Sequence, residues 1–188
     1  MAYTVEFKKL VANNPKMLRN VLEVLPALER QGEHSSVNQD GLRITFFQAR
    51  NWSNNFKVET GDEAFFVRKE LGRGTGFNAI KAFQEAKRRL GDDPNVGFIN
   101  YQLGYTDKFG NDYFVAKWEN FPILSDYLGQ ETLPDDERDA IAEKLSLIYT
   151  VLSDFKDVTT ANMFYDPERK KILLFDLEMK KRDESETS

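Results

Sequence analysis

The chain has 188 residues, enough to form one substantial hydrophobic core or two small lobes. Its net charge of −5 argues against nucleic acid as a partner, because phosphate backbones bind basic surfaces. The absence of cysteine excludes disulfides and thiolate metal sites, and no apolar run is long enough to span a bilayer. We therefore expect a cytoplasmic globular protein without membrane or nucleic-acid partners, with export by a route that uses no cleavable signal left open.

Residues 1–41 are predicted to form an N-terminal helical extension. Between Pro15 and Arg30 the apolar residues recur at the spacing of an amphipathic helix; they are Met17, Leu18, Val21, Leu22, Val24 and Leu25. The polar residues 31–40 that follow are predicted to form a loop. This loop contains the only histidine, His34, and a lone loop histidine is usually incidental to function.

The next segment, residues 42–70, changes to a pattern typical of β-strands. Three apolar stretches are separated by a polar connection at 49–55 and a turn at 60–63, so we expect an antiparallel meander. A glycine-rich break at 72–76 then leads to a helix predicted for residues 78–90.

The second half of the chain mixes strands and helices. Two strands are predicted at 97–105 and 112–118, followed by a short helix at 123–128. A long helix is predicted from 134 to about 155, with acidic residues in its first turn, where the helix dipole favours them. Its apolar stripe consists of Ile141, Leu145, Ile148 and Leu152. The charged residues 180–188 are expected to be a disordered tail.

Three polar residues follow the long helix in the order Asp157, Asn162, Asp176, with a predicted hairpin between the last two. In phosphoryl transfer, one carboxylate orients the attacking hydroxyl, while an amide and a second carboxylate hold Mg²⁺ on the nucleotide phosphates. The spacing Asp-x4-Asn, then a hairpin, then a strand ending in aspartate is typical of that chemistry. Taken singly, each residue also has an ordinary structural explanation as a loop acid, a turn residue or a strand-end cap.

The order of the predicted elements, together with these three residues, resembles the protein-kinase-like superfamily, and most of all its aminoglycoside-phosphotransferase-like branch. The resemblance covers about residues 42–179. It implies an α+β, two-lobed fold, with a five-stranded antiparallel sheet and one helix in an N-lobe at 42–118. A reduced, mostly helical C-lobe would occupy 119–179, and the implied cofactors are ATP and Mg²⁺.

The resemblance implies a role for each residue of the C-terminal hairpin. Asp157 matches the catalytic aspartate, Asn162 the metal-binding asparagine, and Asp176 the aspartate of the metal-binding turn. The sequence Asp-Leu-Glu at 176–178 departs from Asp-Phe-Gly but suits the phosphotransferase branch, where an acid often follows.

The third strand of the meander resembles the strand that carries the phosphate-binding lysine. Either Arg68 or Lys69 could be this cation, and Lys69 is favoured because Val67 suits the small, nucleotide-facing position two residues before it. Glu85 resembles the helix glutamate that forms an ion pair with that lysine. The alternative for Glu85 is an ordinary i,i+4 pair with Arg89. The segment 118–122 resembles the hinge between the lobes.

Three departures from the family pattern bear on activity. The connection at 49–55 contains no glycine, which is expected to impair phosphate binding, although Ser53, Asn54 and Asn55 could donate hydrogen bonds to phosphate. Asp157 is preceded by Phe-Lys instead of the usual histidine-containing pair. The sequence also ends soon after Asp176, so an acceptor, a protein partner or a second copy of the chain would have to complete the short C-lobe.

Two functions follow from the resemblance. The first is an ATP- and Mg²⁺-dependent phosphotransferase whose acceptor the sequence does not reveal. The second is a pseudokinase, in which the same fold serves as a protein-binding or regulatory module without phosphoryl transfer. A third and weaker interpretation is an unrelated α+β interaction domain.

Overall fold

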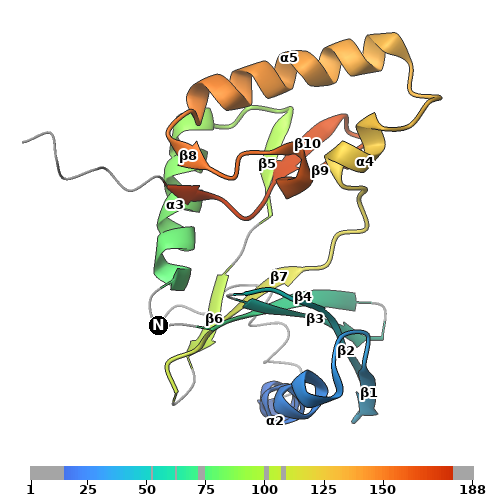
Figure 1. Cartoon of the computed structure of the whole chain (residues 1–188), viewed down its shortest axis with the longest axis vertical. Coiled ribbons are helices and arrows are strands. Elements are labelled where there is room, and N and C mark those ends of the chain that lie inside the picture. The colour runs from blue at the N-terminus through green and yellow to red at the C-terminus, as the bar shows by residue number, and fades with distance from the viewer. Residues whose placement is uncertain are drawn as a thin grey trace, which may run out of the picture. The chain divides into compact units, whose positions relative to one another are not determined.

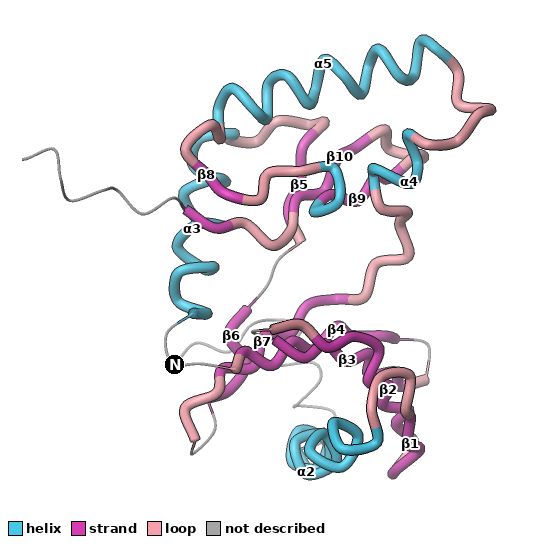
Figure 2. The backbone as a smooth tube through the Cα atoms, viewed as in Figure 1, coloured by secondary structure: helices cyan, strands magenta, loops and turns pink. Residues whose placement is uncertain are grey.

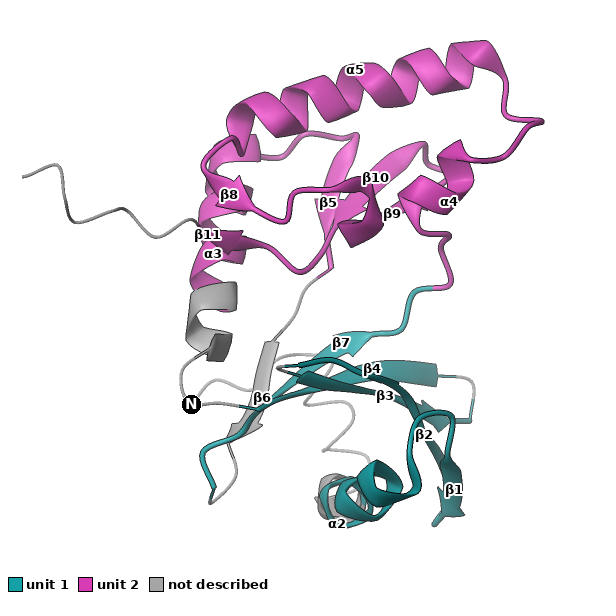
Figure 3. Ribbon diagram, in the orientation of Figure 1, with its two compact units in different colours: residues 1–76, 100–119 teal, residues 77–99, 120–188 magenta. Residues whose placement is uncertain are grey.

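The computed structural model describes residues 15–51, 53–61, 63–71, 75–99, 102–106 and 109–179, with side chains placed except at 15–20, 75–79 and 102–106. The chain divides into two compact units, coloured separately in Figure 3. The first unit comprises residues 1–76 and 100–119, and the second comprises 77–99 and 120–188. The predicted tail at 180–188 and most of the glycine-rich break lie outside the described residues.

The first unit is built on one antiparallel sheet in the order β1-β2-β3-β4-β7-β6 (Figure 1). Its strands are β1 (Ser36–Gln39), β2 (Leu42–Ala49), β3 (Ser53–Thr60), β4 (Glu63–Glu70), β6 (Gln102–Thr106) and β7 (Asp112–Lys117). The predicted α+β class and the five antiparallel strands are confirmed. The chain order is broken at one edge, where β7 pairs with β4 and β6 lies outside it.

The sixth strand, β1, corrects the prediction of a loop at residues 31–40. It pairs with β2 through a tight turn in which Asp40 and Gly41 both have positive φ, at 52° and 79°. Two consecutive residues of positive φ match the right-handed twist of a two-residue hairpin. The polar composition of Ser36–Gln39 concealed this edge strand, because it has little apolar alternation.

Helix α2 (Pro15–Gln31) covers one face of this sheet (Figure 1). It contributes Val21, Leu25 and Leu28, which recur at intervals of four and three residues and therefore lie on one side of the helix. The sheet contributes the alternate residues that face the helix: Leu42, Ile44, Phe46, Phe56, Val58, Phe65, Val67, Tyr113 and Val115. The amphipathic helix predicted at the N-terminus is confirmed over its described residues.

The second unit contains helices and two small sheets (Figure 2). Its helices are α3 (Thr75–Leu90), of which the first two residues belong to the other unit, α4 (Leu124–Leu128) and α5 (Asp135–Val151). One sheet has the order β5-β10-β9, and β8 pairs with β11 in the other. These strands are β5 (Val96–Phe98), β8 (Phe155–Lys156), β9 (Met163–Asp166), β10 (Lys171–Leu174) and β11 (Glu178–Met179).

Two predicted boundaries in this half of the chain are wrong. The strand expected at 97–105 is two strands in different sheets, since β5 runs parallel to β10 while β6 pairs with β7. The long helix ends at Val151 and not near 155, because Phe155 and Lys156 pair with β11. Local hydrophobicity does not reveal which partner a strand will take, so the strand-like pattern of residues 97–105 concealed the break.

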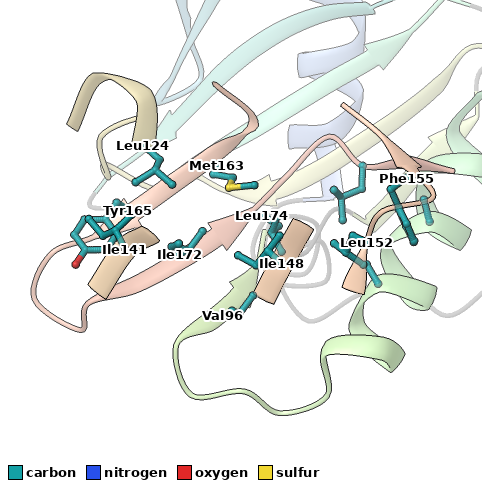
Figure 4. Close-up of a cluster of buried hydrophobic side chains, with 13 residues drawn as sticks. Val96, Leu124, Ile141, Ile148, Leu152, Phe155, Met163, Tyr165, Ile172 and Leu174 are labelled. Carbon is teal, nitrogen blue, oxygen red and sulfur yellow. The ribbon is translucent and has the colours of Figure 1, made fainter. Parts of the chain in front are cut away.

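The core of the second unit lies between α5 and the hairpin β9–β10 (Figure 4). The predicted stripe of α5 is confirmed, since Ile141, Ile148 and Leu152 are buried and Leu145 packs against them. They meet inward-facing residues of the strands and of α4: Val96, Leu124, Met163, Tyr165, Ile172 and Leu174. Among the described residues, no helix combines the length and the apolar character needed to cross a bilayer.

Candidate functional site

Asp157 and Asp176 lie at the same end of the β8–β11 ladder, and Asn162 lies between them in the sequence. Lys156 pairs with Glu178, so the chain continues from β8 directly into Asp157 and enters β11 through Asp176 and Leu177. Asn162 closes the 3-10 helix Thr160–Asn162, immediately before β9. The antiparallel register therefore brings together loops whose acidic residues are nineteen positions apart in the sequence.

Hydrogen bonds through Asn162 join these loops. The Asn162 side-chain amide nitrogen donates to the Asp157 carbonyl oxygen at 2.9 Å. The Asn162 carbonyl oxygen accepts from the Phe175 N–H at 3.1 Å, which fixes the residue preceding Asp176. Since the amide nitrogen is committed to Asp157, the amide oxygen is the group of this side chain with the chemistry of a metal ligand.

Asp157 and Asp176 share an uncommon backbone conformation. Their φ angles are 57° and 54°, in the left-handed region that costs energy for a residue with a Cβ. Both side chains are exposed, and Asn162 is half-buried. Such strain is often retained where it aims a side chain for function.

The donor set suits Mg²⁺, which prefers carboxylate and amide oxygens and keeps part of its shell for substrate phosphates and water. Among the described residues, no group of three or more Asp, Glu or His side chains could hold a metal by itself. At this hairpin, Asn162 and Asp176 are the residues that would supply amide and carboxylate oxygens to a metal.

Lys69, the favoured cation, lies on the face of the sheet that α2 covers. Its ammonium nitrogen lies 2.8 and 2.9 Å from the two carboxylate oxygens of Glu29 in α2. The Asn54 amide nitrogen donates to the same carboxylate at 2.8 Å. Lys69 is only 9% exposed. Two of the predicted phosphate-binding residues therefore share one internal carboxylate.

The other two predicted contacts, Arg68 and Ser53, lie on the opposite face of the sheet. Alternation along β3 and β4 directs them away from α2, and the register pairs Ser53 with Glu70. Arg68 forms an ion pair with Glu70, and the Ser53 side chain is buried. The predicted phosphate contacts thus form two separate pairs, one on each face of the sheet.

Glu85 has partners other than the predicted lysine. Its carboxylate accepts from Arg88 at 2.7 and 2.8 Å and from Arg89 at 2.8 Å. These guanidinium groups lower the pKa of Glu85 to about 2. The i,i+4 pair of Glu85 with Arg89 is observed, and Lys69 has a carboxylate partner within its own unit, Glu29.

Arg89 connects α3 to the segment that leads into Asp157. It donates to both carboxylate oxygens of Asp154, at 2.5 and 3.0 Å, and its guanidinium lies 5.3 Å from the centre of the Phe155 ring. Glu85 therefore orients Arg89, and Arg89 holds the turn before β8. Sequence reasoning missed both Glu29 and Asp154, because neither stands at a family motif; the only signal for Glu29 was an acid directly after the buried Leu28.

The sequence matches no protein-family model, and no curated protein matches it. Among solved structures, the chain is similar to the BubR1 kinase domain, with 11% identity and a TM-score of 0.45 over 93% of this chain. It is also similar to the kinase PK-1 of Cydia pomonella granulovirus, with 12% identity and a TM-score of 0.47 over 86% of this chain. The chain spans 59% and 57% of the lengths of those two chains. At this level of likeness, function has to be inferred from the residues themselves.

Proposed function

We propose that the chain is an ATP- and Mg²⁺-dependent phosphotransferase of a minimal, kinase-like type, whose acceptor is a hydroxyl group. The observation that carries the proposal is that the loops bearing Asp157, Asn162 and Asp176 are joined by the β8–β11 ladder and by the hydrogen bonds of Asn162. The sheet order β2-β3-β4-β7-β6 supports it, because β4, with its two cations, is flanked by strands on both sides. Kinship with the aminoglycoside-phosphotransferase branch is part of the proposal.

Each residue at the hairpin would have its own role in the reaction. Asp157 accepts a hydrogen bond from the acceptor hydroxyl and orients its oxygen, which forms a bond to the γ-phosphorus of ATP. The bond between that phosphorus and the β–γ bridging oxygen breaks, ADP leaves, and the hydroxyl proton passes to Asp157. Asn162 and Asp176 would hold Mg²⁺, which offsets the phosphate charge. Positioning and charge stabilisation of this kind account for most of the catalysis in phosphoryl transfer.

The proposal assigns the phosphate-binding cation to β4. Lys69 with Asn54 and Arg68 with Ser53 are alternative pairs, since they lie on opposite faces of the sheet. A cytoplasmic location, and a protein partner or second copy that completes the short C-lobe, also belong to the proposal.

The second candidate function is a pseudokinase, and the burial of Lys69 favours it. A lysine that is 9% exposed and bound by Glu29 has no free access to phosphate in this conformation. The β2–β3 connection is closed by a hydrogen bond from the Arg50 N–H to the Ser53 carbonyl at 2.8 Å, and it contains no glycine. In this function the fold binds a partner protein and transfers no phosphate.

A thermal-shift titration with ATP and Mg²⁺ tests the proposal. The wild type should be stabilised by ATP with Mg²⁺ more than by ATP with a chelator, by about 2.7 kcal/mol at a hundredfold excess of ligand over Kd. Asp176→Ala should lose the Mg²⁺-dependent part of this stabilisation. The matched control is Glu168→Ala, in the exposed β9–β10 turn. Absence of a Mg²⁺-dependent shift both in the wild type and in Glu29→Gln, which releases Lys69 from its ion pair, would overturn the proposal.

A phosphoryl-transfer assay separates the two candidate functions. An active enzyme should lose transfer in Asp157→Ala while it retains its affinity for ATP with Mg²⁺. Nucleotide binding without transfer to water, to the chain itself or to any hydroxyl acceptor supports the pseudokinase.

A further inference from the structure

The end of α2 and the residues after it contact three hydrogen-bond donors around the β2–β3 connection. Glu29 accepts from the Lys69 ammonium and from the Asn54 amide. Four residues later, Glu33 accepts from the Ala49 backbone N–H at the end of β2. Two carboxylates from one short stretch therefore bind one cation, one side-chain amide and one main-chain N–H.

These three donors form the kind of set that binds a phosphate group. Phosphate oxygens and carboxylate oxygens accept hydrogen bonds from the same donors, and a lysine beside main-chain and side-chain amides is a common phosphate-binding combination. A bound carboxylate must leave before a phosphate can take its hydrogen bonds. A phosphate beside a carboxylate that stayed would also be repelled by its charge.

We propose that Glu29 and Glu33 act as an internal mimic of phosphate, so that α2 inhibits nucleotide binding at Lys69 until its C-terminal end is released. This inference rests on the proposed function, because it assigns Lys69 and Asn54 as the phosphate-binding pair. It explains why a cation on a central strand is buried under a helix. It also unites the two candidate functions, since the closed form binds nucleotide weakly and the open form binds it well.

The local structure allows this release to be confined to one end of the helix. Val21, Leu25 and Leu28 anchor α2 in the core, whereas Glu29 lies two residues before the helix ends at Gln31. Gly32, with a φ of 95°, donates its N–H to the Leu28 carbonyl and terminates the helix. Fraying of this last turn withdraws the Glu29 carboxylate and leaves the apolar anchor in place. Glu33 follows when the backbone hydrogen bonds that join His34 and Ser35 to Phe46 also open.

The experiment measures the Kd of ATP with Mg²⁺, by isothermal titration calorimetry on the full chain. If a mostly closed population lowers the apparent affinity of the wild type, Glu29→Gln should tighten binding by about fivefold, and Glu29→Gln with Glu33→Gln by about tenfold. Glu23→Gln, on the exposed side of the same helix, is the charge-matched control and should leave the Kd unchanged. If Glu29→Gln is too unstable to measure, Glu29→Asp replaces it in the titration. This substitution keeps the charge but shortens the side chain that reaches Lys69.

Hydrogen exchange gives a second readout. Amides at the C-terminal end of α2 should exchange faster when ATP and Mg²⁺ are bound to the wild type, while those near Val21 should not change. Unchanged or weaker nucleotide binding in Glu29→Gln overturns the inference but leaves the proposed function standing if the wild type still binds in an Asp176-dependent way. If neither the wild type nor any variant binds ATP with Mg²⁺, both proposals fail.

Discussion

Two clusters of acidic and basic residues, one in each unit, use similar groups in different surroundings. In the first unit, Lys69 of β4 and Glu29 of the amphipathic helix α2 form a pair whose side chains are 11% and 19% exposed. In the second unit, Glu85 and Arg88 form a pair in which the arginine side chain is 71% exposed. The two pairs therefore differ in what the loss of one partner costs, because a buried charge that loses its partner has no water to replace it.

The exposed cluster has a different role. Arg89 reaches both Glu85 and Asp154, so it ties α3 to the turn that precedes β8 and Asp157. Salt and solvent weaken such pairs, but the planar guanidinium still defines a direction through its paired hydrogen bonds. We infer that this cluster positions the Asp157 loop and contributes little to the stability of the fold.

The largest expected effect is the loss of the buried cation. Lys69→Met leaves the Glu29 carboxylate buried without its charged partner, and should lower the free energy of unfolding by about 3–5 kcal/mol, measured by urea denaturation. The matched control is Lys57→Met in β3, whose pair with Glu59 is more exposed, and its cost should stay below about 1 kcal/mol. An equal loss in the free energy of unfolding for the two variants would show that the buried pair is no more important for stability than the exposed one.

Exchanging the charges of Glu29 and Lys69 tests the same buried pair. Glu29→Lys combined with Lys69→Glu restores opposite charges across the α2–β4 contact, and should recover about 0.5–3 kcal/mol relative to the sum of the single variants. Because the cation then sits on α2, ATP with Mg²⁺ should no longer stabilise the protein. A double variant that is stable and still binds nucleotide at wild-type affinity would show that the cation on β4 does not bind phosphate.

A smaller effect is expected at Arg89. Arg89→Lys keeps the positive charge but cannot form paired hydrogen bonds with Asp154, so the Asp157 loop should be held less firmly. Phosphoryl transfer should fall by roughly tenfold with the Kd for ATP and Mg²⁺ unchanged, as small misplacements of a catalytic group reduce rate rather than binding. Arg88→Lys, at the exposed side of Glu85, is the control. A change in Kd without a change in rate would refute the positioning role.

The smallest expected effect concerns the titration of Glu85. The pKa of Glu85 is about 2, below its ordinary value of 4.5, because Arg88 and then Arg89 bond to its charged form. A lowered folded-state pKa adds stability above pH 4.5, and this contribution is lost as the pH falls through about 2. Carboxyl NMR should show a Glu85 midpoint near 2 that rises toward 4.5 in Arg88→Ala. A midpoint already at the ordinary value in the wild type would exclude these bonds in solution.

Local elements of this chain were predictable from residue patterns. The meander of β2, β3 and β4 follows from apolar stretches separated by polar turns, and the stripe of α5 follows from helical spacing. The hairpin with Asp157, Asn162 and Asp176 was predicted as an order of residues, and the ladder and hydrogen bonds show how close the loops come. Their metal-binding and catalytic roles remain predictions.

The sequence by itself determined which residues share a strand, a helix face or a turn, because these depend on neighbours within a few positions. The tertiary structure alone decided that α2 covers the Lys69 face, that Glu29 is the partner of a lysine forty positions away, and that β6 lies outside β7. The physical reason is that alternation assigns side chains to the two faces of a strand but does not say what covers each face. Long-range charge pairs depend on how the helices and strands pack, which local patterns do not specify.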